Sequence, residues 1–337
     1  MQANAKRASD VGYGWTKFSV GEVEKGTTGG AVVKTDAFQS LPFAKQTIFD
    51  MGGLGKGPRL IDVNFLEDDY CVSDNPSIVA PASTTRIKGE KFVASREYGV
   101  CLAAAIKSMG VSSLDKLVLG TPVGNYVSAK KILEERFSEC IEFDGRSVAI
   151  KKLQVVAQPI GGLVWHYFST NSVKSISDTP RLLIDAGYGT LDWVVAHGLT
   201  PNVSESGSSS DGVSKFVDEV FLRLREGEKG ISESAVLRNK IDRLITRDES
   251  LFYRGKTHER KEYEEVINKM ADDAVQLVSS SIGDPSFLQS IVLMGGGARL
   301  FQRALHKSFG GIPVELIADA RNANVCGFQI IAEHGSA

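Results

Sequence analysis

Two glycine-rich stretches of the chain each open with an aspartate and could together bind a phosphorylated ligand. Residues 10–17 read DVGYGWTK and residues 185–192 read DAGYGTLD, so both contain the pattern Asp-x-Gly-Tyr-Gly. Glycines at this spacing permit a tight hairpin and let the backbone approach a ligand closely. Several backbone N–H groups of such a hairpin point into one concavity, which suits phosphate oxygens. Each stretch therefore predicts a hairpin that cradles phosphate groups.

The aspartates of the two stretches are suited to a metal ion, because a carboxylate cannot contact phosphate comfortably. Asp10 and Asp185 could hold a hydrated Mg²⁺ that the phosphates share, mostly through its waters, since Mg²⁺ dehydrates reluctantly. Asp192 follows the second turn, where it could join the outer shell of the metal or equally cap a strand end. We therefore expect Mg²⁺ at Asp10 and Asp185, with the role of Asp192 open.

The repetition of the pattern is more informative than either copy. One glycine-rich hairpin is most often an ordinary β-turn, but here both copies continue with threonine, Thr16 and Thr190. Two such hairpins from two similar domains could grip a triphosphate from opposite sides. We therefore expect a duplicated fold with a nucleotide in the cleft between its halves.

A third glycine-rich stretch could hold the rest of a nucleotide. Residues 290–300 read SIVLMGGGARL, an apolar strand followed by three glycines and the start of a helix. Such a turn lets a flat base and its ribose lie directly against the backbone, although it could also be a plain strand-to-helix turn. The residues expected to contact the nucleotide are Gly12, Tyr13, Gly14, Trp15, Thr16, Lys17, Gly187, Tyr188, Gly189, Thr190, Gly295, Gly296, Gly297 and Ala298.

Strands and helices alternate along the chain, which indicates an α/β fold. Apolar or alternating runs predict strands, which begin at residues 17, 29, 59, 69, 116, 147, 181, 190 and 290. Apolar positions with a period near 3.6 predict core-facing helices at 95–110, 214–227 and 261–283. Residues 204–212 are expected to form a loop, and the mixed charges of residues 226–262 favour a solvated helical insertion.

Length and composition exclude several classes of protein. A chain of 337 residues is long enough for about two domains. Its net charge of −2 gives no broadly basic surface for direct binding to DNA or an anionic membrane. Its four cysteines are scattered and predict free thiols rather than a zinc site or disulfide framework. No apolar stretch is long enough for a transmembrane helix, and no secretory signal is expected.

The order of these stretches resembles that of ATPases in the actin/Hsp70/sugar-kinase superfamily, over almost the whole chain. A first phosphate hairpin, a connecting segment at Gln158, a second phosphate hairpin, an adenosine segment at 294–298 and a final helix at 319–335 follow one another. DVGYGWTK with its lysine resembles bacterial actin-like proteins of the ParM and Alp type, with the PRTRC system protein D branch as one candidate. GTPVGNY at 120–126 and NANVCGF at 322–328 are similar to segments of plasmid-borne actin-like proteins.

The resemblance implies an actin-like two-domain fold, built from duplicated ribonuclease H-like cores with a nucleotide cleft between them. Domain I would comprise residues 1–160 and 317–337, and domain II residues 161–316 with a charged helical insertion at about 205–262. The polar N-terminal segment QANAKRAS departs from the family pattern, in which the first strand is apolar up to its aspartate. Either main-chain pairing alone holds this strand, or the native start has been altered.

The resemblance also implies an ATPase that forms filaments. Lys17 would neutralise the phosphates, and Gln158 would orient the attacking water beside Asp10 and Asp185. ATP or GTP with Mg²⁺ would be bound, and cytoplasmic filaments would segregate plasmids through an adaptor protein on DNA. A small-molecule kinase of the superfamily is one alternative, but it needs a carboxylate base where Gln158 stands. A non-catalytic nucleotide-binding scaffold is the other, and the retention of Lys17, Gln158 and both aspartates disfavours it.

Overall fold

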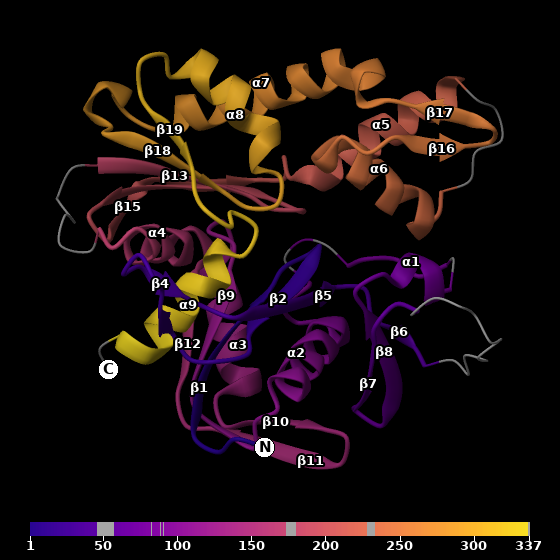
Figure 1. Cartoon of the computed structure of the whole chain (residues 1–337), viewed down its shortest axis with the longest axis vertical. Helices are drawn as coiled ribbons and strands as arrows, with labels where there is room; N and C mark the ends of the chain where they lie inside the picture. The colour runs from indigo at the N-terminus through magenta and orange to yellow at the C-terminus, as the bar shows by residue number, and fades with distance from the viewer. Residues whose placement is uncertain are drawn as a thin grey trace.

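Two mixed β-sheets, one in each half of the molecule, form the framework of the fold (Figure 1). The structure is a computed structural model. It describes residues 1–45, 57–81, 83–87, 89, 91–172, 180–227 and 233–335. Residues 228–232 of the expected insertion and residues 336–337 of the expected domain I lie outside the described residues.

The first sheet has the strand order β10-β11-β9-β1-β2-β5, with β12 also paired to β9. Its strands are β1 (Ala5–Val11), β2 (Trp15–Ser19), β5 (Thr35–Gln39), β9 (Ser113–Thr121), β10 (Cys140–Phe143), β11 (Arg146–Ile150) and β12 (Leu153–Ala157). The second sheet has the order β15-β14-β13-β18-β19. Its strands are β13 (Pro180–Ala186), β14 (Leu191–His197), β15 (Thr200–Ser209), β18 (Ser290–Met294) and β19 (Val314–Leu316).

The two sheets repeat one pattern of connections. In each, a first strand pairs antiparallel with the next through a tight hairpin, and that second strand pairs antiparallel with a third. The other edge of the first strand pairs in parallel with a later strand, β9 beside β1 and β18 beside β13. The hairpins β1–β2 and β13–β14 therefore occupy equivalent places in the two halves.

The polar segment before Asp10 is a strand at the centre of its sheet. Strand β1 is paired on one edge with β2 and on the other with β9, so its backbone is satisfied on both sides. Ala5, Ala8 and Val11 contribute the buried apolar surface, and Ser19 Oγ accepts from the Ala8 N–H at 2.9 Å. Main-chain pairing and small side chains thus account for a strand that lacks an apolar run.

Two helices, α4 (Gln158–Ser169) and α9 (Ala323–His334), lie between the sheets (Figure 1). Val325, Phe328 and Ala332 of α9 pack on the first sheet beside Ala8 and Val118. The other side of α9 joins α4 in a core against β13, β14 and β18 of the second sheet. The C-terminal segment therefore returns to β1 and β9 and also contacts the second half.

Further helices cover the outer faces of the sheets. Helices α2 (Arg96–Met109) and α3 (Tyr126–Phe137) share the core of the first sheet, and α5 (Val213–Gly227), α7 (Glu264–Ser281) and α8 (Ala298–Ser308) share that of the second. The remaining elements are β3 (Glu24–Lys25), β4 (Ala31–Val32), β6 (Phe43–Ala44), β7 (Leu60–Phe65), β8 (Asp68–Ser73), α1 (Pro76–Val79), α6 (Ala235–Arg247), β16 (Leu251–Tyr253), β17 (Lys256–His258) and the 3₁₀ turns η2 (Arg260–Tyr263) and η3 (Pro285–Phe287). None of the helices in the described ranges has the length and apolarity to cross a membrane.

The structure corrects several expectations from the sequence. Most of the expected loop at 204–212 belongs to strand β15, whose backbone pairs with β14 despite its serines. The expected insertion at about 205–262 is not one solvated helical unit. It includes α5 and α6, which bury apolar stripes in the core, and the hairpin β16–β17. The apolar period of residues 261–283 includes Leu277, which is exposed on α7, whereas Ala271 and Val275 belong to the buried face.

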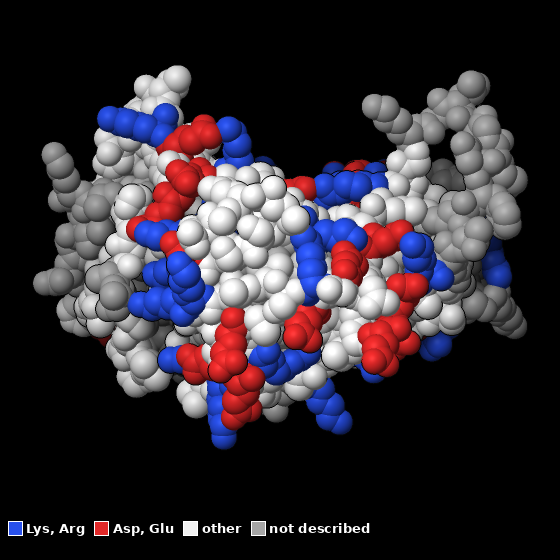
Figure 2. Space-filling view, turned by 90° about the horizontal axis from the view of Figure 1, so that it is seen from below, with Lys and Arg blue, Asp and Glu red and all other residues white. Residues whose placement is uncertain are grey.

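Charged side chains of both signs alternate over the face formed by the first half of the molecule. Figure 2 views the molecule from below and shows lysine and arginine interleaved with aspartate and glutamate. On α3, Lys130 and Lys131 pair with Glu134 and Glu135. This mixture of signs is typical of a solvated surface.

Candidate functional site

A cavity of about 910 Å³ lies between the two sheets, where both hairpins meet. Parallel strands β1 and β9 end at its floor, and β13 and β18 end at its roof, so residues from both halves line it. It is lined by every sequence-predicted residue except Thr16 and Asp192. Those that line it are Asp10, Gly12, Tyr13, Gly14, Trp15, Lys17, Gln158, Asp185, Gly187, Tyr188, Gly189, Thr190, Gly295, Gly296, Gly297 and Ala298.

The tips of the two hairpins interlock, which explains their glycines. A Cβ on Gly14 would lie 2.7 Å from Tyr188 Cβ, and a Cβ on Gly189 would lie 2.4 Å from the ring of Tyr13. Each tyrosine therefore occupies the space left by the glycine of the other hairpin. Both turns are closed in the same way, since Gly12 N–H donates to the Trp15 carbonyl and Gly187 N–H to the Thr190 carbonyl. The repeated sequence thus builds two matching turns that contact each other.

Asp10 is fully buried and is held by a cation and an amide. Lys17 Nζ lies 2.7 Å from Asp10 Oδ2, and Gln158 Nε2 donates to Asp10 Oδ1 at 2.6 Å. Lys17 comes from the neighbouring strand β2, and Gln158 is the first residue of α4, with Pro159 in the first helical turn. The sequence predicts only a connecting segment at Gln158, so its helical position comes from the structure.

Asp185 is also buried, but no lysine or arginine in the described ranges pairs with it. Asn324 Nδ2 of α9 donates to Asp185 Oδ2 at 2.6 Å. Burial, and after it the nearby charge of Asp192, raises the pKa of Asp185 to about 7. Asn324 Oδ1 is buried and has no hydrogen-bond partner among the residues that the structure describes. Two carboxylates and an unsatisfied amide oxygen form the hard oxygen set that suits Mg²⁺.

Thr16 does not line the cavity, contrary to expectation, and Asp192, whose role was left open, does not line it either. Thr16 alternates with the cavity-lining Trp15 and Lys17 on β2, and its hydroxyl is buried 2.8 Å from Ser40 Oγ. Asp192 accepts the Thr190 hydroxyl at 2.6 Å and the Val123 N–H at 2.7 Å. Asp192 therefore joins the second hairpin to the loop after β9.

The three glycines after β18 differ in what surrounds them. Gly295 has φ +91°, and a Cβ there would lie 2.5 Å from Asp185 Oδ1. A Cβ on Gly297 would lie 2.5 Å from Val213 Cγ2, whereas one on Gly296 would meet nothing within 4 Å. Gly295 and Gly297 are thus required by packing, and Gly296 presents bare backbone to the open cavity.

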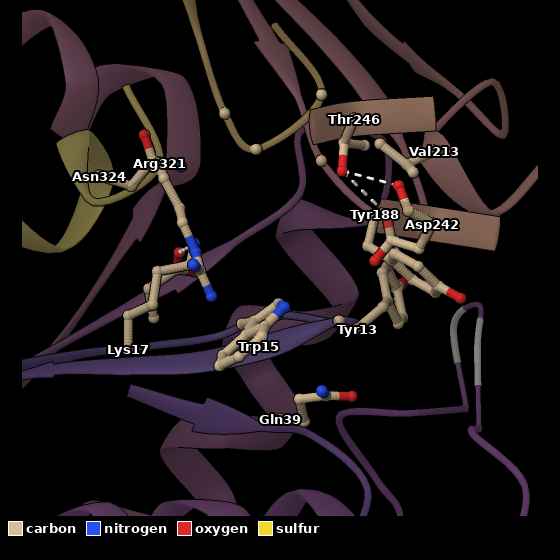
Figure 3. Close-up of a pocket in the computed structure, with 18 of the residues that line it drawn as sticks. Tyr13, Trp15, Lys17, Gln39, Tyr188, Val213, Asp242, Thr246, Arg321 and Asn324 are labelled. Carbon is tan, nitrogen blue, oxygen red and sulfur yellow. Dashed lines mark hydrogen bonds and ion pairs between the residues drawn. The ribbon is translucent and has the colours of Figure 1, made fainter. Parts of the chain in front are cut away.

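Sequence reasoning missed cavity residues on α6 and on the segment before α9. Asp242, Thr246 and Arg321 line the cavity (Figure 3). Thr246 Oγ1 donates to the Asp242 backbone carbonyl, and burial raises the pKa of the Asp242 carboxyl. The buried stripe of α6 consists of Leu237, Ile241, Leu244 and Ile245. This helical period within a charge-rich segment was the sequence signal that could have predicted α6. Arg321 carried no signal of its own.

Models of actin-like families match both halves of the chain. The N-terminal domain of actin-like proteins matches residues 8–161, and the C-terminal domain of an archaeal, MreB-like actin homologue matches residues 183–307. No curated protein matches the chain in sequence.

Solved structures of actin homologues have the same fold. The archaeal actin homologue Ta0583 is 19% identical, covers 100% of both chains and superposes with a TM-score of 0.77. Its complex with ADP has a TM-score of 0.73 at 17% identity, covering 99% of this chain and 100% of the other. A ParM from a 15-stranded filament of Clostridium botulinum has a TM-score of 0.72 at 17% identity, covering 98% and 99%.

Proposed function

The chain belongs to the actin-like proteins, and from this premise we propose that it binds and slowly hydrolyses ATP with Mg²⁺ and assembles into filaments. The observation that carries the proposal is the pair of interlocked hairpins at the cavity. They bring glycine-rich backbone from both halves, together with Lys17 and two buried carboxylates, to the wall of one cavity. The ADP complex of the archaeal homologue supports a nucleotide as the ligand.

Each part of the cavity suits one part of ATP. The N–H groups of residues 13–15 and 188–190 would cradle the phosphates, since those of Gly12 and Gly187 close the turns. The bare backbone of Gly296 would lie beside adenosine. Asp10 and Asp185 would hold Mg²⁺ through its waters, with Asn324 Oδ1 accepting from one of them. The ion would neutralise charge on the phosphates.

Gln158 is suited to positioning water for hydrolysis. Its amide nitrogen is held by Asp10 at 2.6 Å, which fixes the orientation of the group at the cavity wall. The oxygen of a neutral amide can accept a hydrogen bond from water, but it cannot usefully remove a proton from the water. Catalysis by positioning without a strong base is slow in an isolated subunit. ATP-bound subunits could then assemble before hydrolysis weakens their contacts.

Filament formation would serve the segregation of plasmids or other DNA elements in the cytoplasm. The ParM filament and the AlfA filament of a Bacillus subtilis plasmid are structural neighbours, and they support self-association of this chain. An adaptor protein on the DNA would link filament and cargo.

Light scattering after addition of ATP and Mg²⁺, followed by electron microscopy, tests the proposal. We expect ATP-dependent filaments, release of phosphate on a slower timescale, and neither event for Lys17→Ala. Nucleotide binding without hydrolysis or assembly would instead support the non-catalytic scaffold. Absence of assembly at every protein concentration tested would refute the filament model.

A further inference from the structure

Arg321 approaches the cavity from the segment before α9 and lies over Trp15 of the first hairpin. Its guanidinium carbon is 3.9 Å from the centre of the indole ring, and both residues line the cavity (Figure 3). Trp15 alternates with buried Thr16 on β2, so its side chain is directed to the cavity side. The preceding residue, Gly14, packs against Tyr188, which fixes the backbone that carries Trp15.

The other cations that line the cavity are paired or exposed. Lys17 pairs with Asp10 at 2.7 Å, Arg243 and Arg247 both contact Glu249, and Arg299 is exposed. Arg321 differs, because no carboxylate in the described ranges lies within ion-pair distance of it. Burial, and then repulsion from Arg247, lowers the pKa of Arg321. Attraction to Asp242 and Asp319 raises this pKa by less, and neither carboxylate forms an ion pair with the half-buried guanidinium.

A second arginine stacked on a hairpin aromatic is satisfied differently. Arg86 lies over the ring of Tyr188 at 4.9 Å, but it also donates to Gln39 Oε1. It lines a second cavity of about 600 Å³ rather than the cavity between the hairpins. The comparison shows that stacking on an aromatic ring leaves the N–H edge of a guanidinium available, and that Arg86 uses this edge within the protein.

We propose that Arg321 binds the phosphate chain of the nucleotide and that Trp15 positions it for this contact. This inference rests on the proposed function, because it assigns a residue to the same ligand. The indole covers one face of the guanidinium. The planar N–H fork of the guanidinium matches two phosphate oxygens. Lys17 shares its charge with Asp10, whereas Arg321 forms no ion pair among the described residues, so Arg321 can supply the additional positive charge that a polyanion requires.

Affinities for ADP, ATP and adenosine test the assignment in Arg321→Gln. We expect about a tenfold or larger loss for ADP and ATP, because a charge-assisted contact is removed. The affinity for adenosine, measured by competition up to millimolar concentration, should stay within about twofold. Arg321→Lys should recover part of the lost affinity. Trp15→Leu should also lower the affinity for ADP.

Arg146 supplies a matched control, since its guanidinium carbon lies 4.5 Å from the centre of the Phe143 ring on β10, and neither residue lines the cavity. Arg146→Gln should leave all affinities unchanged. Thermal unfolding of each variant checks that it folds.

Tryptophan fluorescence gives an independent readout. Trp15 lines the cavity, whereas Trp165 and Trp193 are buried, with 7% and 5% of their surface exposed, and do not line it. Saturating ADP with Mg²⁺ should change the emission of the native chain and leave that of Trp15→Phe unchanged. In Arg321→Gln the change should be smaller at saturation.

Two results would overturn the inference while leaving ATP binding intact. One is unchanged ADP affinity in Arg321→Gln, and the other is an equal loss for adenosine and ADP, which would assign Arg321 to the base or ribose. Failure of the native chain to bind any of the three ligands would instead refute the proposed function itself.

Discussion

At the scale of single residues, the negative charges of the two buried aspartates in the cavity are compensated to different extents. Asp10 has Lys17 at 2.7 Å and Gln158 at 2.6 Å, so its charge is paired. Among the described residues, the side chain that holds Asp185 at this range is the amide of Asn324, and burial and Asp192 raise the pKa of Asp185 to about 7. The attraction of Lys17 only partly offsets the effects of burial and of Asp192 on Asp185, and a metal ion held there would supply further positive charge.

Asp185 predicts a pH dependence of stability in the nucleotide-free chain. The pKa of Asp185 is about 7 in the folded state, against an ordinary value of 3.8, so the folded state binds the proton more tightly. The stabilising contribution of the Asp185 carboxyl to the free energy of unfolding is fully present below about pH 4 and is lost as the pH rises through about 7. Asp185→Asn keeps an acceptor for Asn324, so it should raise the melting temperature at pH 8 more than at pH 5. If Asp185→Asn changed the melting temperature equally at both pH values in the absence of metal, the raised pKa of Asp185 would be contradicted.

Gln158→Ala should separate binding from hydrolysis. The variant loses the amide that positions water but keeps both hairpins, so ATP affinity and assembly should persist. Hydrolysis should fall by about 100-fold, the cost of misplacing a reacting group. Filaments should consequently last longer, as followed by light scattering after ATP is depleted. Hydrolysis at the native rate would remove Gln158 from the reaction.

Gly296→Val should block nucleotide binding without unfolding the chain. A Cβ on Gly296 meets no protein atom within 4 Å, so a side chain begins in open space there and would enter the space assigned to adenosine. Gly310→Val is the matched control, because Gly310 is equally open and does not line the cavity. Calorimetric titration with ADP compares the two. Normal affinity in a folded Gly296→Val chain would leave these glycines as a plain helix-entry turn.

At the scale of elements, the crossing of α4 and α9 joins the two halves behind the cavity. Glycines let these helices approach closely, since a Cβ on Gly327 would lie 1.7 Å from the Gly161 carbonyl oxygen. A Cβ on Gly162 would lie 1.9 Å from Met294 Sδ. The same two helices carry Gln158 and Asn324, whose amides contact Asp10 and Asp185. Close packing here therefore sets the positions of two cavity residues.

Gly327→Ala should destabilise the chain although alanine favours helices. Replacing a helical glycine normally stabilises by up to about 1 kcal/mol. At this crossing the added methyl group would collide with backbone, and overpacking typically costs about 1–3 kcal/mol. Urea unfolding should show a net loss, whereas Gly21→Ala, at a site with nothing within 4 Å, should show little change. Unchanged stability would mean that the two helices can separate freely.

At the scale of the whole molecule, the described parts of the two halves meet at several places around the cavity. The hairpin tips interlock, α4 and α9 lie between the sheets, and at the mouth Asn239 Nδ2 of α6 donates to Ser77 Oγ of α1 at 3.1 Å. The last contact joins small polar side chains and can be exchanged for water. A ligand gripped by both hairpins would therefore bias the closure of the mouth, which links nucleotide state to subunit shape.

Self-association is predicted to use both ends of the second half. Phe252 on the β16–β17 hairpin is 63% exposed, and Phe287 of η3 is 73% exposed. Phe287 lies near the start of β13, where Gln289 N–H donates to the Pro180 carbonyl, and this is the end of the sheet opposite the second hairpin. Exposed aromatic side chains at two separate places suit head-to-tail contacts, which give open filaments.

Phe252→Ser and Phe287→Ser should each raise the critical concentration for assembly, by about tenfold for one buried aromatic side chain. ADP affinity should remain that of the native chain, since neither residue lines the cavity. Sedimentation of ATP-treated protein measures the assembled fraction. Unaltered assembly of the double variant would move the interface elsewhere.

The amino-acid sequence alone determined the class of fold, the duplication and most of the cavity lining. These features depend on local pattern: apolar strands end at glycine turns, and the same turn occurs twice. The pattern Asp-x-Gly-Tyr-Gly predicts a hairpin at each of the two places where it occurs. The order of the motifs then predicted the actin-like fold, which the family matches and solved structures confirm.

Only the tertiary structure decided which side chains face the cavity. Thr16 and Asp192 belong to the predicted motifs, yet strand pleating directs Thr16 into the core and the loop after β9 takes up Asp192. Arg321 and Asp242 lie in segments without a motif and reach the cavity because α6 and α9 pack beside it. Local sequence encodes turns and periods, whereas long-range packing sets the direction of each side chain and the charges around it.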